Sequence, residues 1–143
     1  MSTVIDARDP KRLARWWAEV LDYHVVYESA EMTFIADRAF PKITGNASRR
    51  AFESPPVGPG LTFIAVGAEK AAKNRVHLDL RAAPGLQGEE RMAALEAECD
   101  RLVALGATKV SEEPCREHGS TWLLMSDPEG NEFCVCDGGV GAG

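Results

Sequence analysis

The sequence predicts an α+β fold of antiparallel sheets and helices, on the basis of three observations. The 143-residue chain has the length of one domain, with 45% hydrophobic and 27% charged residues, as in ordinary globular proteins. The order strand, helix, three strands occurs twice along it. The apolar runs are too short for helices alternating with a parallel sheet. Neither half could bury its sheet and helix alone, so we expect a single domain over 1–143.

The first half, about 1–70, begins with a β-favouring run at 3–7 that leads into a helix. Asp9 is placed to cap this helix, and Pro10 lies in its first turn. Apolar residues then recur every three or four positions, which marks one buried face: Leu13, Trp16, Trp17, Val20 and Leu21. Further strands are expected at 24–28, 32–37 and 61–66.

Residues 38–60 interrupt this half with a segment rich in proline and glycine, which resists both helix and central strand. Loops of this length are uncommon inside compact domains and often belong to binding sites. The segment is therefore either a lid over a site or a surface insertion without fixed structure.

The second half, about 73–137, repeats the order of elements. Residues 75–81 alternate like a strand, and a helix follows in which Met92, Leu95, Cys99 and Leu102 keep helical spacing. Gly106 stands where that helix is expected to end. Three strands are expected after it, at 108–110, 121–125 and 132–136, with a type I turn at 127–130 before the last.

Charge and composition exclude several classes of function. The net charge is -6, and lysine and arginine are scattered, so a nucleic-acid-binding face is not expected. The N-terminal region lacks the apolar stretch of a signal peptide or membrane helix, which favours a cytoplasmic protein with four reduced cysteines and no membrane partner. Nucleophile elbows and glycine-rich phosphate loops are missing from the sequence, so phosphoryl and acyl transfer have no support.

Four segments carry a resemblance to a known family: DARDPKRLARWWAEVLDY, KNRVHLDLRA, LVALGAT and DPEGNEFCV. Together they resemble the vicinal oxygen chelate superfamily, which contains glyoxalases, bleomycin-resistance proteins and extradiol dioxygenases, and in particular its glyoxalase-like members. The resemblance implies paired βαβββ modules whose sheets curl around a central cavity, in a homodimer.

The resemblance also implies four positions for a divalent metal, which fall at Ser2, Ile64, His77 and Cys134. Only His77 is a usual ligand there, since Ile64 offers no donor and Ser2 a poor one. We therefore expect no metal site of the usual kind and no cofactor. The alternative is a soft metal in an altered geometry, held by His77, Cys134 and Glu132.

Strand alternation identifies the side chains that would face the cavity. If His77 points inward, so do Asp79 and Arg81, while Val76, Leu78 and Leu80 face a helix. The same rule adds Glu132, Cys134 and Cys136 from the last strand, and Val4 and Asp6 from the first. These inward sets are polar, which predicts a wet cavity.

The inward residues allow two interpretations. In the first, His77 with Glu132 or Asp79 forms a general acid/base pair, because imidazole titrates near neutrality. In the second, Arg81 centres a structural ion-pair network around an ordinary histidine. His24 and His118 are expected on the surface or in loops.

Two aromatic residues, Phe34 and Trp122, lie on strands that would wall the cavity, where each would either stack on a flat ligand or belong to the core. Together with Asp6, Ile64, Arg81 and Cys134 they make up the expected ligand-binding set. The sequence thus leaves two functions open. One is a protein that binds a small or flat organic ligand, as drug-resistance members of the superfamily do. The other is a lyase or isomerase that acts on a small carbonyl compound through His77, Asp79 and Glu132.

Overall fold

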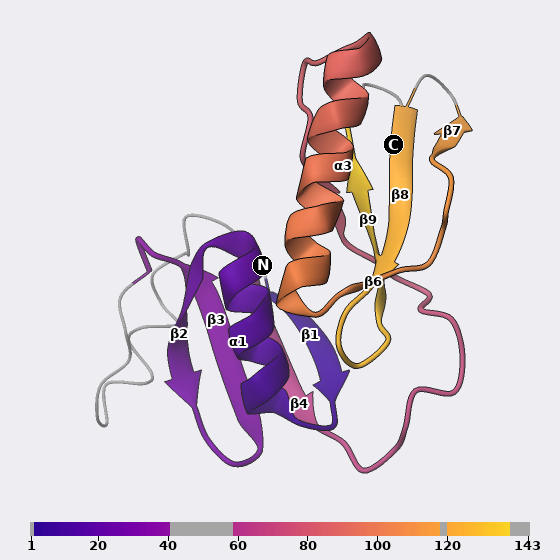
Figure 1. Cartoon of the computed structure of the whole chain (residues 1–143). Coiled ribbons are helices and arrows are strands. Elements are labelled where there is room, and N and C mark those ends of the chain that lie inside the picture. The colour runs from indigo at the N-terminus through magenta and orange to yellow at the C-terminus, as the bar shows by residue number, and fades with distance from the viewer. Residues whose placement is uncertain (1, 41–58, 118–119, 138–143) are drawn as a thin grey trace. The chain divides into compact units, whose positions relative to one another are not determined.

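The computed structural model describes residues 2–40, 59–117 and 120–137. The chain divides into two compact units, residues 1–69 and 70–143, and each has its own sheet with a helix against it (Figure 1). Among the described residues, no helix combines the length and the apolar character needed to cross a bilayer. The fold is α+β, as the sequence predicts.

The first unit contains β1 (Ser2–Ala7), α1 (Pro10–Leu21), β2 (Tyr23–Glu28), β3 (Met32–Asp37) and β4 (Gly60–Ala65). Its strands lie in the order β1-β4-β3-β2. Asp9 caps α1 as expected, because its Oδ1 accepts a hydrogen bond from the Arg12 N–H at 3.0 Å. Residues 41–58, most of the segment predicted as a loop, lie outside the described residues.

One face of the first sheet packs against α1. Trp17, Leu13, Ile35 and Phe63 are among its fully buried side chains. Because paired residues of neighbouring strands point to the same face, Asp6, Ile64 and Met32 share the opposite face with Phe34. The alternation predicted for β1 is therefore the one observed.

The second unit contains β5 (Asp79–Arg81), α3 (Gly88–Leu105), β6 (Thr108–Lys109), β7 (Cys115–Glu117), β8 (Ser120–Ser126) and β9 (Glu132–Cys136). The strands lie in the order β5-β9-β8-β6, and β7 also pairs with β8. Gly106 ends α3 with a φ of 110°, a left-handed conformation that its missing side chain permits. Leu95, Cys99 and Leu102 of α3 are fully buried, as are Met125, Phe133 and Val135 of the adjoining sheet.

The sheets are mixed rather than wholly antiparallel, which corrects the prediction in one respect. In each unit the first strand runs parallel to the last, β1 beside β4 and β5 beside β9. The remaining pairs are antiparallel, as expected.

The strand predicted over 75–81 is also shorter in the structure, where only Asp79–Arg81 forms β5. Asp79 pairs with Cys134, and β9 begins at Glu132 after the turn, so the residues before His77 have no strand opposite them. His77 therefore lies in the segment leading into β5. Val76, which was expected to pack against a helix, is 74% exposed for the same reason.

Candidate functional site

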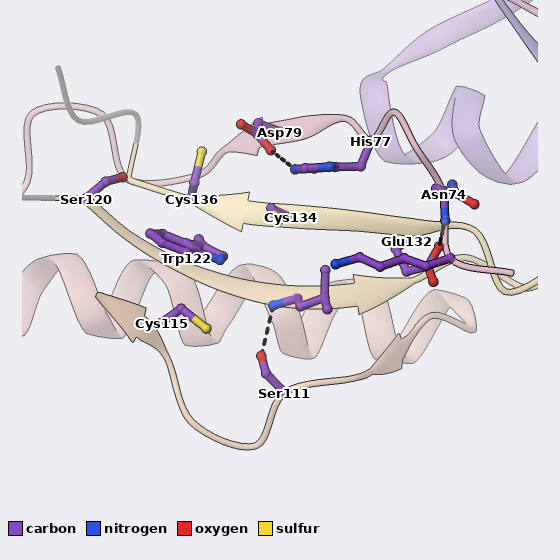
Figure 2. Close-up of a pocket in the computed structure, with 12 residues that line it drawn as sticks. Asn74, His77, Asp79, Ser111, Cys115, Ser120, Trp122, Glu132, Cys134 and Cys136 are labelled. Carbon is purple, nitrogen blue, oxygen red and sulfur yellow. Dashed lines mark hydrogen bonds and ion pairs between the residues drawn. The ribbon is translucent and has the colours of Figure 1, made fainter. Parts of the chain in front are cut away.

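The second unit contains a pocket of about 410 Å³ on the face of its sheet opposite α3. This volume lies in the range of small-molecule sites. Figure 2 shows the residues that line it: Lys73, Asn74, His77, Asp79, Ser111, Cys115, Ser120, Trp122, Leu124, Glu132, Cys134 and Cys136. All of these lining residues belong to residues 70–143.

Alternation along β9 determines which side chains reach the pocket. Cys134 and Cys136 face it, whereas Phe133 and Val135 between them are fully buried in the core. On β8 the pocket side carries Leu124 and Trp122, which pair with Cys134 and Cys136 respectively. The apolar part of the pocket thus comes from two neighbouring strands.

Trp122 lies in the middle of this apolar part. Its strand position pairs with Cys136 of β9 on one side and with Cys115 of β7 on the other, and Figure 2 shows the indole between the two cysteines. The side chain is partly exposed, in contrast to Trp16 and Trp17, which are buried on α1. Trp122 therefore presents an accessible aromatic surface to the pocket.

Asp137 holds one end of the pocket in place. Its carboxylate is 4% exposed and accepts hydrogen bonds from the Ser120 hydroxyl at 2.9 Å and from the Thr121 N–H at 3.0 Å. The Arg91 guanidinium of α3 lies 3.0 Å from the same carboxylate. This network connects the start of β8, the end of β9 and the helix.

His77, Asp79 and Cys134 bring three possible metal-ligand atoms together in the pocket. The His77 Nε2 lies 3.4 Å from Oδ1 of Asp79, and the donor atoms of all three residues lie within 4.8 Å of one another. His77 and Asp79 are each 47% exposed at the side chain, whereas Cys134 is buried. Burial, together with the Asp79 charge, raises the pKa of the Cys134 thiol to about 11, so the thiol is protonated near neutral pH.

Glu132 lines the pocket, but its carboxylate is engaged elsewhere. It accepts a hydrogen bond from the Asn74 N–H at 3.0 Å and lies 3.0 Å from the Lys70 ammonium. The Asn74 N–H and, to a smaller extent, Lys70 lower the pKa of Glu132. The carboxylate thus fastens the segment before β5 to the start of β9, and the partner of His77 is Asp79.

Three of the predicted binding residues do not line this pocket. Asp6 and Ile64 lie on exposed positions of the first sheet, and Arg81 is exposed at the end of β5, outside the pocket lining. Within the described part of the chain Arg81 makes no ion pair, so the expected network centred on it is not found there.

Phe34 lies in an apolar cluster, which is the core alternative that the sequence left open for it. Its ring is 4% exposed and packs edge to face on Phe40 at 5.6 Å, in an apolar cluster with Val26 and Ala36. A side chain added at Gly60 would meet the Phe34 ring at 2.4 Å, so the ring lies directly on the backbone of β4. His24 lies partly buried on β2 rather than at the surface, and His118 is outside the described residues.

Several lining residues escaped prediction. Cys115 lies on β7, whose sequence lacks the alternating apolar pattern that marked the other strands. Ser111 reaches the pocket because its Oγ accepts a hydrogen bond from the Leu124 N–H at 2.9 Å. Strand alternation could have predicted Ser120 and Leu124 as pocket residues, since both share a face of β8 with Trp122.

The four positions that the resemblance assigned to a divalent metal do not form a site of the usual kind. Ile64 carries only hydrocarbon and lies with Ser2 in the first sheet, where the two occupy strands β4 and β1. Only His77 and Cys134 of the four offer strong donor atoms.

Comparisons with known proteins support the fold. A family model described as a glyoxalase-like domain matches residues 2–136. A glyoxalase/bleomycin resistance protein/dioxygenase family enzyme from Burkholderia phytofirmans is 16% identical, with a TM-score of 0.63 and 94% of both chains covered. A search of curated proteins finds no match.

Two further solved structures share the fold. A bleomycin resistance determinant encoded on transposon Tn5 has a TM-score of 0.55 at 14% identity, with 98% of each chain covered. Lactoylglutathione lyase from Agrobacterium tumefaciens has a TM-score of 0.56 at 18% identity, covering 96% of this chain and 92% of the other. With a family model that spans nearly the whole sequence, the chain belongs to the glyoxalase-like domain family of the vicinal oxygen chelate superfamily.

Proposed function

We propose that the protein binds a small organic ligand with a flat, partly apolar surface in the pocket of its second unit. The observation that carries the proposal is the accessible Trp122 between two cysteines, because an exposed indole in a concave site is a stacking surface. Lys73, Asn74, His77 and Ser111 surround it with polar groups that would orient the ligand. The fold shared with a bleomycin resistance determinant supports drug or natural-product sequestration as the role.

The test is a binding screen with planar aromatic compounds, bleomycin included. Trp16 and Trp17 are buried, so quenching of tryptophan fluorescence by a bound compound reports mainly on Trp122 in the unsubstituted chain. Isothermal titration calorimetry then measures the affinity of the Trp122 variants, which lack this fluorophore. We expect Trp122→Ala to lose binding by at least about tenfold, equivalent to the ~1.4 kcal/mol of one stacking contact. Trp122→Phe, the matched control, keeps a flat ring and should retain most of the affinity. Unchanged affinity in Trp122→Ala would refute the proposed site.

The second candidate function is acid/base catalysis on a small carbonyl compound. The 3.4 Å contact between His77 and Asp79 favours it, because a carboxylate beside an imidazole orients the ring. The His77 imidazole would accept or donate the substrate's proton, and Asp79 would hold the imidazole in position. The fold shared with lactoylglutathione lyase is compatible with a lyase or isomerase.

Exchange of carbon-bound hydrogen with deuterated solvent separates catalysis from binding alone. With small α-hydroxy carbonyl compounds or lactoylglutathione as substrates, His77→Asn should abolish exchange and Asp79→Asn should slow it by about 10²-fold or more. Glu132→Gln is the control, since its carboxylate is held by Lys70 and Asn74. Exchange that persists in His77→Asn would exclude this function.

We further propose that the protein acts in the cytoplasm as a homodimer without nucleic-acid or membrane partners. The acidic net charge of -6 supports the exclusion of nucleic acid. Light scattering of the purified chain should give twice the mass of 15.5 kDa, and a mass of one chain would refute the dimer.

A further inference from the structure

We propose that His77, Asp79 and Cys134 form a binding site for a soft divalent cation, with Zn²⁺ as its type, built entirely within the second unit. The three residues supply one nitrogen, one oxygen and one sulfur donor. This set shares His77 and Cys134 with the inherited quartet but differs from it, because Asp79 is not one of the four positions and neither Ser2 nor Ile64 belongs to the set. The site does not depend on the organic ligand proposed above.

The distances agree with tetrahedral coordination. With bonds of about 2.0 Å to nitrogen and oxygen, neighbouring donors of a tetrahedral zinc ion lie about 3.3 Å apart. The His77 Nε2 and the Asp79 Oδ1 are 3.4 Å apart. The sulfur bond of about 2.3 Å requires about 3.6 Å from sulfur to the other donors, against an upper limit of 4.8 Å in the structure. The distances to sulfur therefore exceed the required separation by at most about 1.2 Å.

The backbone holds two of the donors in place before any cation binds. Asp79 and Cys134 are directly paired across the parallel strands β5 and β9. Next to them, the Cys134 N–H donates to the Leu78 carbonyl at 2.9 Å. His77 is two residues from Asp79 and already in contact with it. Binding thus requires little ordering of the main chain.

The chemistry of the donors selects the cation. On binding, the Cys134 thiol exchanges its proton, which is released to solvent, for the cation. The resulting thiolate favours zinc and other soft ions over magnesium, calcium and manganese, which prefer oxygen. Three protein donors leave a fourth position that opens to the pocket, as in catalytic rather than structural zinc sites. Glu132, which the sequence grouped with His77 and Cys134, is not in this set and remains bound to Lys70 and Asn74.

Cobalt(II) titration of the full chain tests the site, because cobalt replaces zinc and has visible spectra. Protein treated with a chelator and a reductant should bind one equivalent of Co²⁺. A near-ultraviolet charge-transfer band would identify a thiolate ligand, and intense visible bands would identify tetrahedral geometry. Added Zn²⁺ should remove both signals. The proposal would be overturned if the dissociation constants for Co²⁺ and Zn²⁺ were both weaker than micromolar.

Matched variants assign the ligands. Cys134→Ser should abolish the charge-transfer band, and His77→Gln or Asp79→Asn should weaken binding at least about tenfold, since loss of even an outer partner of a metal ligand has effects of this size. Cys136→Ser and Cys115→Ser are the thiol controls and should keep the band. His77 and Asp79 are partly exposed, so their variants should fold even if Cys134→Ser does not. A band that survives in Asp79→Asn and His77→Gln with unchanged affinity would refute the site.

Discussion

The Asp137 carboxylate is a buried charge that the second unit satisfies completely with local partners. Ser120, Thr121 and Arg91 contact it from a strand and a helix. Removal of such a group costs more than one hydrogen bond, because the donors that faced it remain buried and unpaired. The pocket wall at Ser120 therefore depends on a residue that does not itself line the pocket.

Asp137→Ala should lower the free energy of unfolding by about 2–4 kcal/mol. Denaturant unfolding of the variant and the parent chain measures this difference. Asp137→Asn keeps an oxygen that can accept from the Thr121 N–H, so its loss should be smaller. Equal effects of the two substitutions would show that the charge, and not the hydrogen bonds, dominates.

Individual site residues were predictable only where strand alternation governed them. The pocket-facing positions of Cys134 and Trp122 follow from a period of two along β9 and β8. Phe34 obeys the same rule, yet Phe40 covers its ring from a segment whose sequence indicated only a loop. The engagement of Glu132 by the Asn74 N–H likewise depends on a backbone position that no side-chain pattern encodes.

Among the helices and strands, α1 is an element whose own sequence was sufficient to predict it. Asp9, Pro10 and the apolar spacing together define where the helix begins and which face it buries. Strands β5 and β7 show the opposite case. The length of β5 is set by where β9 begins, and β7 forms because β8 offers it an edge. The length of β5 and the existence of β7 therefore cannot be predicted from their own sequences.

The cap of α1 gives a prediction at this scale. Asp9→Ala should destabilise the protein by about 1 kcal/mol, because the Arg12 N–H loses its acceptor. Asp9→Ser or Asp9→Asn should restore most of this loss. Thermal unfolding of the three variants measures the effect, and an unchanged midpoint in Asp9→Ala would contradict the capping role.

Cys99 of helix α3 makes the free energy of unfolding depend on pH. Burial raises the pKa of this thiol to about 11, whereas a thiol in the unfolded chain titrates near 8.5. Above pH ~8.5 the unfolded state therefore loses its proton first, and the folded state holds more protons. Stability contributed by the neutral thiol is present below that pH and is lost as the pH rises towards about 11.

Urea unfolding between about pH 8 and pH 11 should accordingly show a falling free energy, and Cys99→Ala should flatten part of this slope. Alanine also leaves a small cavity, so the comparison concerns the slope and not the absolute stability. An identical slope in the variant would mean that Cys99 titrates normally in the fold.

At the scale of the whole molecule, the described chemistry is unevenly distributed. All pocket residues and all three proposed cation ligands belong to residues 70–143. The first unit has a similar order of strands and its own buried core, but its positions equivalent to the metal ligands carry Ser2 and Ile64. The repeat of secondary structure predicted the two units, whereas the position of the pocket-lining residues in residues 70–143 required coordinates.

Hydrogen exchange provides the matching prediction. Addition of Zn²⁺ should slow exchange at short labelling times in residues 77–81 and 132–136, which carry or adjoin the proposed ligands. Residues 2–40 should show no change at these times. Equal protection of both regions would indicate that the cation acts elsewhere or at several places.

Strand β9 alternates between the pocket and the core. Glu132, Cys134 and Cys136 face the pocket while Phe133 and Val135 fill the core, so the strand carries two surfaces of opposite character. Deletion of a single codon within it would exchange them, turning a phenylalanine towards water and a carboxylate into hydrocarbon. A point substitution in β9 therefore changes either the pocket or the core, whereas an insertion or deletion of one residue changes both.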